Sequence, residues 1–283
     1  MSRTPEVKQR SHLLNEHPRS RGANYSRFVE GLRNPAHTPG SHLHRTRGGP
    51  QLDDCARSAD SRVRVDIRCF TVGLFQVNTY LVTDPATKAA VIVDTGESDE
   101  LVQRLAALDP APDVQAILLT HAHVDHAGAL TMLQERYDVP TYLPRAERPL
   151  FEALPQQGDW FGMPQLNRPC GRIDHWIDDG DTVRVGELEL RFIATPGHTP
   201  GQGCYYDEHD IIVGDTLFAG SVGRTDFPLS DPDLARRSLR RLFELPGTLR
   251  VHSGHGPITT LATELKSNPF LGFLRLERKM QRS

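Results

Sequence analysis

The feature that most constrains the fold is the stretch THAHVDHAG at 120–128, which places three histidines and an aspartate within six residues. It follows the apolar run VQAILLT at 114–120, which is typical of a strand buried on both faces. Leu130, Leu133 and Tyr137 then predict the apolar face of a helix. A turn between strand and helix can point the four polar side chains into one small volume. Because imidazoles and carboxylates are ligands for Zn²⁺ and Fe²⁺, the stretch predicts a metal site.

Further candidate ligands follow other apolar runs of the sequence. His198 and His255 lie in the glycine-flanked loops TPGHTPG and SGHGP, and Asp215 ends the run IIVGD. A carboxylate at a strand end without a basic neighbour is costly unless a cation compensates its charge. The predicted metal ligands are therefore His121, His123, Asp125, His126, His198, Asp215 and His255. The histidines that lack this setting, and that we expect to be structural, are His175, His209 and His252.

Composition divides the chain into two parts. Residues 1–62 hold 11 Lys and Arg against 6 Asp and Glu, without sustained apolar periodicity, and are predicted to be a disordered extension. Residues 63–283 are acidic, which disfavours nucleic acid as a partner, and no apolar run approaches transmembrane length or a secretory core. We therefore expect a cytoplasmic protein that binds neither nucleic acid nor membrane. The scattered cysteines, predicted to be free thiols, are Cys55, Cys69, Cys170 and Cys204.

The pattern of strands and helices within 63–283 predicts an α/β domain. The expected strand regions are 63–72, 78–84, 89–96 and 114–120, followed by 181–195 and 204–215, which each hold two short strands. The expected helices include 98–108, with Ser98 as N-cap, and 230–245, with Asp231 as cap and Pro232 in its first turn. Strands followed by a helix, twice over, predict two sheets packed together with helices outside them.

These motifs resemble the metallo-β-lactamase superfamily over about residues 63–271. The HxHxDH run and the three later ligands match its ligand positions in order, and AAVIVDTG resembles its early strand with Asp94. The resemblance implies an αββα sandwich of two mixed sheets with the site at one edge. It also implies two metal ions, with Asp215 bridging them. The ligands implied for the first ion are His121, His123 and His198, and those for the second are Asp125, His126 and His255.

A pair of metal ions would explain the chemistry of such a site. Two divalent ions about 3.5–4 Å apart can hold a bridging hydroxide and polarise a carbonyl or phosphoryl oxygen. We expect zinc, with iron and manganese as alternatives, because histidine and carboxylate ligands accept all three. Asp125 is the predicted catalytic residue, which orients the hydroxide and passes on its proton. Asp94 is expected to orient a ligand histidine, with a structural strand-end cap as the alternative.

Longer strings resemble glyoxalase II-like hydrolases, in particular the short bacterial form. They are VGDTLFAGSVGRTDFP (213–228), TPGHTPGQGCYY (195–206) and SGHGPITTLATELKSNPFL (253–271). The resemblance implies hydrolysis of a small-molecule thioester, S-hydroxyacylglutathione, to a hydroxy acid and a thiol. Longer members carry basic residues close after NPF that hold the glutathione carboxylates, whereas here Arg275 is the first basic residue. The sequence therefore does not identify the thiol of the substrate.

Several residues are candidates for contact with the substrate. The candidates are Arg224, Lys266, Trp160 and Phe161, with Phe75, Gln76 and Asn78 as further positions. Trp160 and Phe161 belong to GDWFGMPQ (158–165), predicted to be an aromatic, glycine-rich loop over the pocket. Each candidate has a structural alternative. Arg224 could pair with Asp226, Lys266 could end a solvated helix, and the aromatic rings could pack in the core.

Other functions fit parts of the pattern. A persulfide dioxygenase-like enzyme shares GRTDF and would hold one iron by His121, His198 and Asp215. A metallo-hydrolase of another ester, a lactone or a phosphodiester would use the same ligands. A β-lactamase is disfavoured because β-lactamases lack a bridging carboxylate such as that of Asp215. An RNase Z-like nuclease is disfavoured because residues 63–283 are acidic. A metal-free binding protein on this fold would be expected to have lost ligands. The sequence does not indicate an oligomeric state.

Overall fold

The computed structural model describes residues 64–281, so the predicted extension 1–62 and Cys55 lie outside the described residues. The first sheet has the strand order β1-β2-β3-β4-β5-β6. Its strands are β1 (Asp66–Val72), β2 (Val77–Thr83), β3 (Ala89–Val93), β4 (Asp113–Leu118), β5 (Thr141–Pro144) and β6 (His175–Ile177). The strands β1 to β3 pair antiparallel, and β3 to β6 pair parallel, so this sheet is mixed.

The second sheet has the strand order β14-β13-β10-β9-β8-β7. Its strands are β7 (Thr182–Val185), β8 (Leu188–Ala194), β9 (Gly203–Tyr206), β10 (Asp210–Gly214), β13 (Arg250–Ser253) and β14 (Thr259–Thr260). Because β9 is antiparallel to both β8 and β10, and β13 is parallel to β10, the strands β8, β10 and β13 end at the same edge. The strands β11 (Leu217–Phe218) and β12 (Ser221–Val222) form a separate hairpin.

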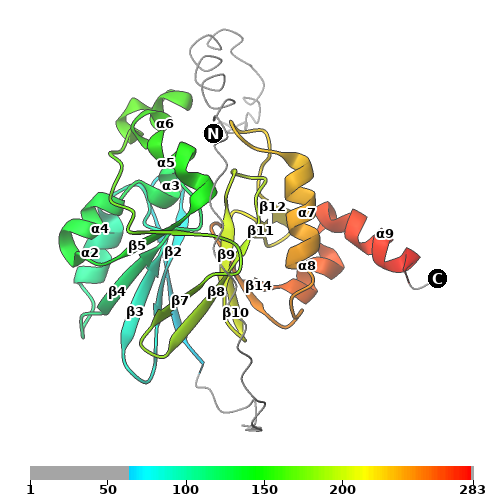
Figure 1. The fold of residues 1–283 in the computed structure, drawn as a ribbon, viewed down its shortest axis with the longest axis horizontal. Coiled ribbons are helices and arrows are strands. Elements are labelled where there is room, and N and C mark those ends of the chain that lie inside the picture. Colours follow the sequence, from blue (N-terminus) through cyan, green and yellow to red (C-terminus); the bar gives the residue numbers. More distant parts are fainter. Residues whose placement is uncertain (1–63, 282–283) are drawn as a thin grey trace, which may run out of the picture. The chain divides into compact units, whose positions relative to one another are not determined.

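Helices cover the outer face of each sheet (Figure 1). Those on the side of the first sheet are α2 (Glu100–Ala106), α3 (Val124–Ala127), α4 (Leu130–Tyr137), α5 (Arg148–Glu152) and α6 (Leu154–Trp160), with the 3₁₀ turns η1 (Arg145–Glu147) and η2 (Pro164–Leu166). Those on the side of the second sheet are α7 (Pro232–Leu242), α8 (Leu261–Ser267) and α9 (Gly272–Met280), with the 3₁₀ turn η3 (Pro269–Leu271). Among the described residues, no helix is long and apolar enough to cross a membrane.

Strand alternation explains how the sheets stack. Along β3, Ile92 packs in the core beneath α2 and α4, while its neighbours Val91 and Val93 pack in the core between the sheets. Along β8, Phe192 faces the space between the sheets, and Ile193 faces the core beneath α7. A period of two places successive side chains on opposite faces, so both sheets are buried on both sides. The predicted αββα sandwich is confirmed.

Some predicted boundaries were wrong for local reasons. The N-cap of α2 is Asp99, not Ser98, and its carboxylate accepts a hydrogen bond from Gln103 Nε2 at 2.7 Å instead of capping the helix. The strand predicted to reach residue 96 ends at Val93, because Asp94 takes a left-handed conformation with φ of 60°. The predicted cap Asp231 is confirmed, since its Oδ1 accepts hydrogen bonds from two backbone N–H groups of α7.

The segment 158–165 is also not the loop that the sequence predicts. Gly158 to Trp160 form the last turn of α6, and η2 begins at Pro164. Both turns were missed because the glycines and the two aromatic residues obscure the helical pattern. Of the four cysteines, Cys69, Cys170 and Cys204 are described, and all three are free thiols, as predicted.

Candidate metal centre

The ends of four strands bring the predicted ligands to one edge of the sandwich. The first four ligands follow β4, where His123 is the N-cap of α3 and Asp125 lies in its first turn. His198 follows β8, Asp215 directly follows β10, and His255 lies two residues beyond β13. The structure brings all seven predicted ligands together, in sets whose donor atoms lie within 4.8 Å of one another.

The first ligand group consists of three buried histidines. Nδ1 of His123 lies 3.1 Å from Nε2 of His121 and 3.0 Å from Nε2 of His198. Burial, together with the neighbouring imidazoles, lowers the pKa of His123 to about 3 and also lowers the pKa values of His121 and His198. All three rings are therefore neutral near pH 7, and one ring nitrogen of each lies within 4.8 Å of the other two. A divalent cation fits this arrangement.

The second ligand group is more polar and more open. His255 Nε2 lies 3.4 Å from Asp125 Oδ2, and His126 Nε2 lies 3.8 Å from the same oxygen. Burial alone would lower the pKa of His126, but the carboxylates of Asp215, Asp125 and Asp94 raise it well above its usual value. The side chains of Asp125 and His255 are 18% and 29% exposed, so this group faces solvent.

Asp215 lies between the two groups. Its Oδ2 is 3.5 Å from Nε2 of His198 in the first group and 3.8 Å from Nε2 of His255 in the second. Its Oδ1 is 3.3 Å from Nε2 of His126, yet both atoms are buried and have no hydrogen-bond partner. Buried polar atoms without partners are rare and need an explanation. The seven side chains offer imidazole nitrogens and carboxylate oxygens, and two of these atoms are buried without a partner. This set of donor atoms fits a pair of divalent cations.

Hydrogen bonds fix the orientation of three ligand rings. His121 Nδ1 lies 3.0 Å from Thr120 Oγ1, and His198 Nδ1 donates to the Arg224 carbonyl at 2.7 Å. His126 Nδ1 donates to Asp94 Oδ2 at 2.8 Å, which places Asp94 beside a ligand histidine, where the sequence predicts it. In each case Nε2 is left to face the centre of the site. Such contacts are common around metal-binding histidines, because they set the tautomer and the ring orientation.

Glu147 was not predicted from the sequence. It is completely buried, and its two oxygens accept hydrogen bonds from the backbone N–H groups of Ala122 at 2.8 Å and Gly201 at 2.6 Å. Ala122 separates His121 from His123, and Gly201 lies in the loop of His198. Glu147 therefore joins the two chain segments that carry the first ligand group. The string PRAERPL offers no motif that would reveal this role.

Two buried glutamines support the same loops. Gln157, from α6, donates to the carbonyl of Ala122 at 2.8 Å and accepts from the N–H of Val124 at 2.9 Å. Gln202 accepts from the N–H of Asp215 at 3.2 Å. The turn after β4 and the turn after β10 are thus held by side chains that come from elsewhere in the chain.

A pocket of about 290 Å³ opens beside the metal centre. Besides ligand side chains, it is lined by Phe75, Val124, Phe161, Phe218, Arg224 and Phe227. Of the predicted substrate contacts, Phe75, Phe161 and Arg224 therefore line it, and their role stays a prediction. Arg224 also forms the alternative ion pair, with Nε and one terminal nitrogen 2.9 and 2.7 Å from the oxygens of Asp226.

The other candidates lie elsewhere. Trp160 packs against the core beneath the helices of the first sheet, which is the structural alternative for that ring. Lys266 is exposed on α8, and neither residue lines the pocket. Gln76 has φ of 53° in the turn before β2. Asn78 is buried and donates to the carbonyls of Ser253 and Gly256 at 3.1 and 2.8 Å, so it supports the loop of His255.

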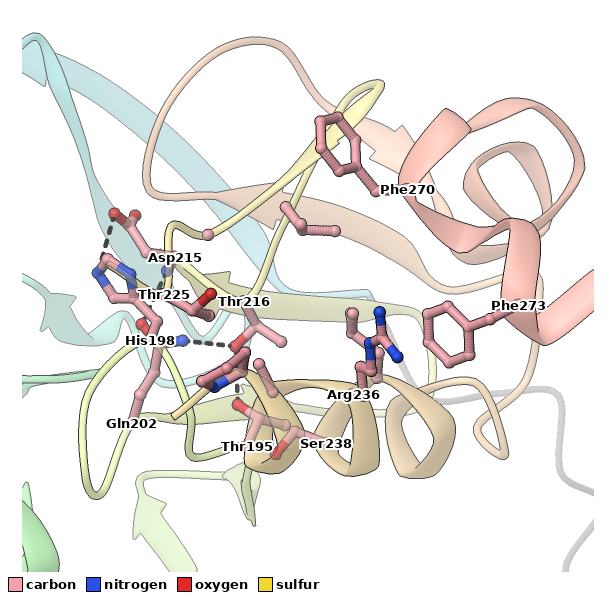
Figure 2. Close-up of a pocket in the computed structure, with 15 residues that line it drawn as sticks. Thr195, His198, Gln202, Asp215, Thr216, Thr225, Arg236, Ser238, Phe270 and Phe273 are labelled. Carbon is pink, nitrogen blue, oxygen red and sulfur yellow. Dashed lines mark hydrogen bonds and ion pairs between the residues drawn. The ribbon is translucent and has the colours of Figure 1, made fainter. Parts of the chain in front are cut away.

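A second cavity, of about 230 Å³, also borders the centre (Figure 2). His198 and Asp215 line it at one end, and Arg236 and Phe273 lie toward the other (Figure 2). The ligands His198 and Asp215 are thus shared by both cavities.

Comparisons with known proteins agree with this fold. A profile of the metallo-β-lactamase superfamily matches residues 72–255. Hydroxyacylglutathione hydrolase GloC of Haemophilus influenzae is 35% identical over 213 residues, which is 73% of this chain and 98% of that protein.

Two solved structures are also similar. The BLEG-1 B3 metallo-β-lactamase has a TM-score of 0.68 and 34% identity, over 73% of this chain and 100% of that one. TTHA1623 in a di-iron-bound form has a TM-score of 0.64 and 37% identity, over 72% of this chain and 100% of that one. The fold therefore has counterparts among solved structures that are 34% and 37% identical to this chain.

Proposed function

The chain belongs to the metallo-β-lactamase superfamily, and we propose that it is a hydrolase with two metal ions that cleaves thioesters. The observation that carries the proposal is the place of Asp215, whose two oxygens lie 3.3–3.8 Å from ligand nitrogens of both groups. A carboxylate in this position suits two cations rather than one. The proposed small-molecule substrate is of the S-hydroxyacylglutathione type, and the products are a hydroxy acid and a thiol.

Two of the similar proteins support the proposal. The relative from Haemophilus influenzae is named for the hydrolysis of hydroxyacylglutathione. TTHA1623 was solved in a di-iron-bound form, which supports two ions in this chain and makes iron as plausible a metal as zinc. The same ligand set could serve a lactone, another ester or a phosphodiester, so the substrate class is the part of the proposal that most needs a test.

Each ligand group is proposed to bind one metal ion. His121, His123 and His198 would hold one ion, Asp125, His126 and His255 the other, and Asp215 both. When bound, such ions supply Lewis acidity and make water acidic enough to act as a nucleophile near pH 7. Asp125, on the pocket wall, is placed to accept the proton of the attacking water. A thiolate can leave without protonation by a strong general acid, so the proposal requires no further catalytic residue.

Asp215→Ala tests the proposal. The wild-type protein should bind two metal ions per chain and hydrolyse S-D-lactoylglutathione. The variant should lose both metals and at least ~10³-fold in kcat/KM, because several kcal/mol of charge stabilisation depend on the ions. Asp179→Ala is the matched control, since Asp179 is exposed and pairs with Arg241 away from the centre.

Other outcomes would reject the proposal. Oxygen uptake with glutathione persulfide by a protein with a single iron would identify an oxidoreductase. Hydrolysis of a chromogenic cephalosporin in place of thioesters would identify a β-lactamase. Full activity of Asp215→Ala would remove the role assigned to that carboxylate.

A further inference from the structure

Four phenylalanine rings form the wall of the pocket beside the metal centre. Phe227 packs edge-on against two ligand rings, with centroids 5.5 Å from His123 and 5.8 Å from His198. Phe161 packs edge-on against Phe227 at 6.0 Å, and Phe218 lies 6.0 Å from the ligand His255. Phe75 completes the wall from the turn before β2. A substrate that reaches the ligands through this pocket therefore lies against aromatic surface.

The arginine in the lining of the pocket is already paired with a carboxylate. Among the described residues that line it, Arg224 is the one Lys or Arg. Its guanidinium is held by both oxygens of Asp226 and lies over the Phe227 ring, 4.4 Å from the centroid. A thiol with two carboxylates, such as glutathione, thus meets no unpaired Lys or Arg in the described lining.

Arg275, the first basic residue after NPFL, is also held by hydrogen bonds. Nη1 of Arg275 donates to the carbonyls of Leu265 and Asn268 at 3.2 and 2.8 Å. These carbonyls belong to the end of α8 and the residue after it, where helix carbonyls lack partners of their own. Arg275 therefore stabilises this helix end, and it does not line the pocket.

The size of the pocket fits a ring. At about 290 Å³, it is roughly twice the ~150 Å³ of an apolar cavity that binds benzene. A lactoyl group, with a single methyl beside its hydroxyl, leaves most of the aromatic wall in water. Burial of apolar surface is favourable in proportion to its area, so a larger hydrocarbon group gains binding energy here that a lactoyl group does not.

We infer that the preferred substrate carries an uncharged hydrocarbon group of ring size next to the thioester, held by the four phenylalanines. The inference rests on the proposed thioester hydrolysis and names the substrate class within it. The hydrocarbon can belong to the acyl side or to the thiol side of the thioester. The wall contacts both ligand groups through Phe227 and Phe218, so either side can reach it.

Four thioesters test the inference with the metal-loaded protein. They combine a lactoyl or a mandeloyl acyl group, which differ by methyl against phenyl, with glutathione or phenylmethanethiol. We expect kcat/KM to be at least ~10-fold higher when a phenyl group is present, since even small apolar differences reach that size in a fitted pocket. A gain that follows mandeloyl places the acyl group on the wall, and one that follows phenylmethanethiol places the thiol there.

Phe161→Ala adds a test of the wall itself. Phe161 is at the pocket edge, 40% exposed, and has no ring contact with a ligand histidine among the described pairs. The variant should lower the ratio of kcat/KM for the phenyl-bearing thioester to that for S-lactoylglutathione by ~5- to 10-fold. Phe161→Leu should restore most of the ratio. Leu276→Ala, which removes an exposed apolar side chain outside both cavities, should leave the ratio unchanged.

Two results separate the failure of this inference from failure of the proposed function. If S-lactoylglutathione is hydrolysed as well as or better than the phenyl-bearing thioesters, the inference is wrong and thioester hydrolysis stands. If none of the four thioesters is hydrolysed by protein that contains metal, the proposed function is wrong, and the inference falls with it.

Discussion

The two ligand groups are built differently around the same Asp215. In the first, three imidazoles are buried, and Glu147 ties the segments that carry them. In the second, His126 is buried, but the side chains of Asp125 and His255 are 18% and 29% exposed on the wall of the pocket.

This difference indicates a division of labour. A closed set of neutral rings holds a cation firmly but leaves little room for a substrate. An open set with a carboxylate gives access to water and substrate at the expense of rigidity. We therefore propose that the seven ligands bind two ions, one in a closed site and one in an open site.

Removing one ligand from each group should have the largest effect. His123→Ala opens the closed group, so we expect the loss of one ion and a fall in kcat of ~10³-fold or more. His255→Ala should weaken its ion less, because water can replace a ligand that is already exposed. Elemental analysis after dialysis against graded chelator measures the metal content of both variants, and steady-state kinetics measures kcat. A greater loss from His255→Ala than from His123→Ala would overturn the comparison, and His209→Ala, on the surface, is the control.

Glu147→Gln should act on the closed group alone. The amide presents an N–H₂ where the structure needs a second acceptor, so the N–H of Ala122 or of Gly201 loses its partner. We expect unfolding free energy to fall by ~1–3 kcal/mol and affinity for the first ion to fall by ~10- to 100-fold.

The control for this variant is Glu264→Gln. Glu264 is also buried and accepts from the N–H of Gly220 at 2.8 Å, but it lies away from the ligands. It should lower stability without changing metal affinity. Equal affinities in Glu147→Gln and Glu264→Gln would show that Glu147 has a structural role only.

Asp94→Asn should have the smallest effect, and on the open group. Asparagine keeps one oxygen that can accept from His126 Nδ1, but it cannot also satisfy both the N–H and the hydroxyl of Thr120. We expect ~10-fold weaker binding of the second ion and unchanged binding of the first, measured by calorimetric titration. Asp84→Asn, another buried aspartate, is the control; weaker binding of the first ion instead would reverse the assignment.

The layers and the ligand positions could be predicted because both depend on local pattern. The continuous apolar run VQAILLT (114–120) predicts a strand buried on both faces. Asp215 directly follows β10, and His255 lies two residues beyond β13, which ends at the same edge. The family resemblance then supplied the order in which the ligands divide. These expectations needed no knowledge of which distant segments touch.

The supporting residues could not be predicted for the opposite reason. Glu147 lies in a charged string, and its partners are backbone N–H groups at Ala122 and Gly201, far from it in sequence. Trp160 and Phe161 are neighbours in sequence, yet one packs against the core and the other lines the pocket. Tertiary contacts decide where each of the two rings packs, and the periodicity of a short, glycine-rich segment does not.

Anomalous diffraction at the absorption edge of the bound metal shows directly whether the seven ligands hold two ions. We expect two peaks about 3.5–4 Å apart. One should lie among His121, His123 and His198, the other among Asp125, His126 and His255, with an oxygen of Asp215 bound to each. A single peak in fully metal-loaded crystals, or an Asp215 that binds only one of two ions, would contradict it.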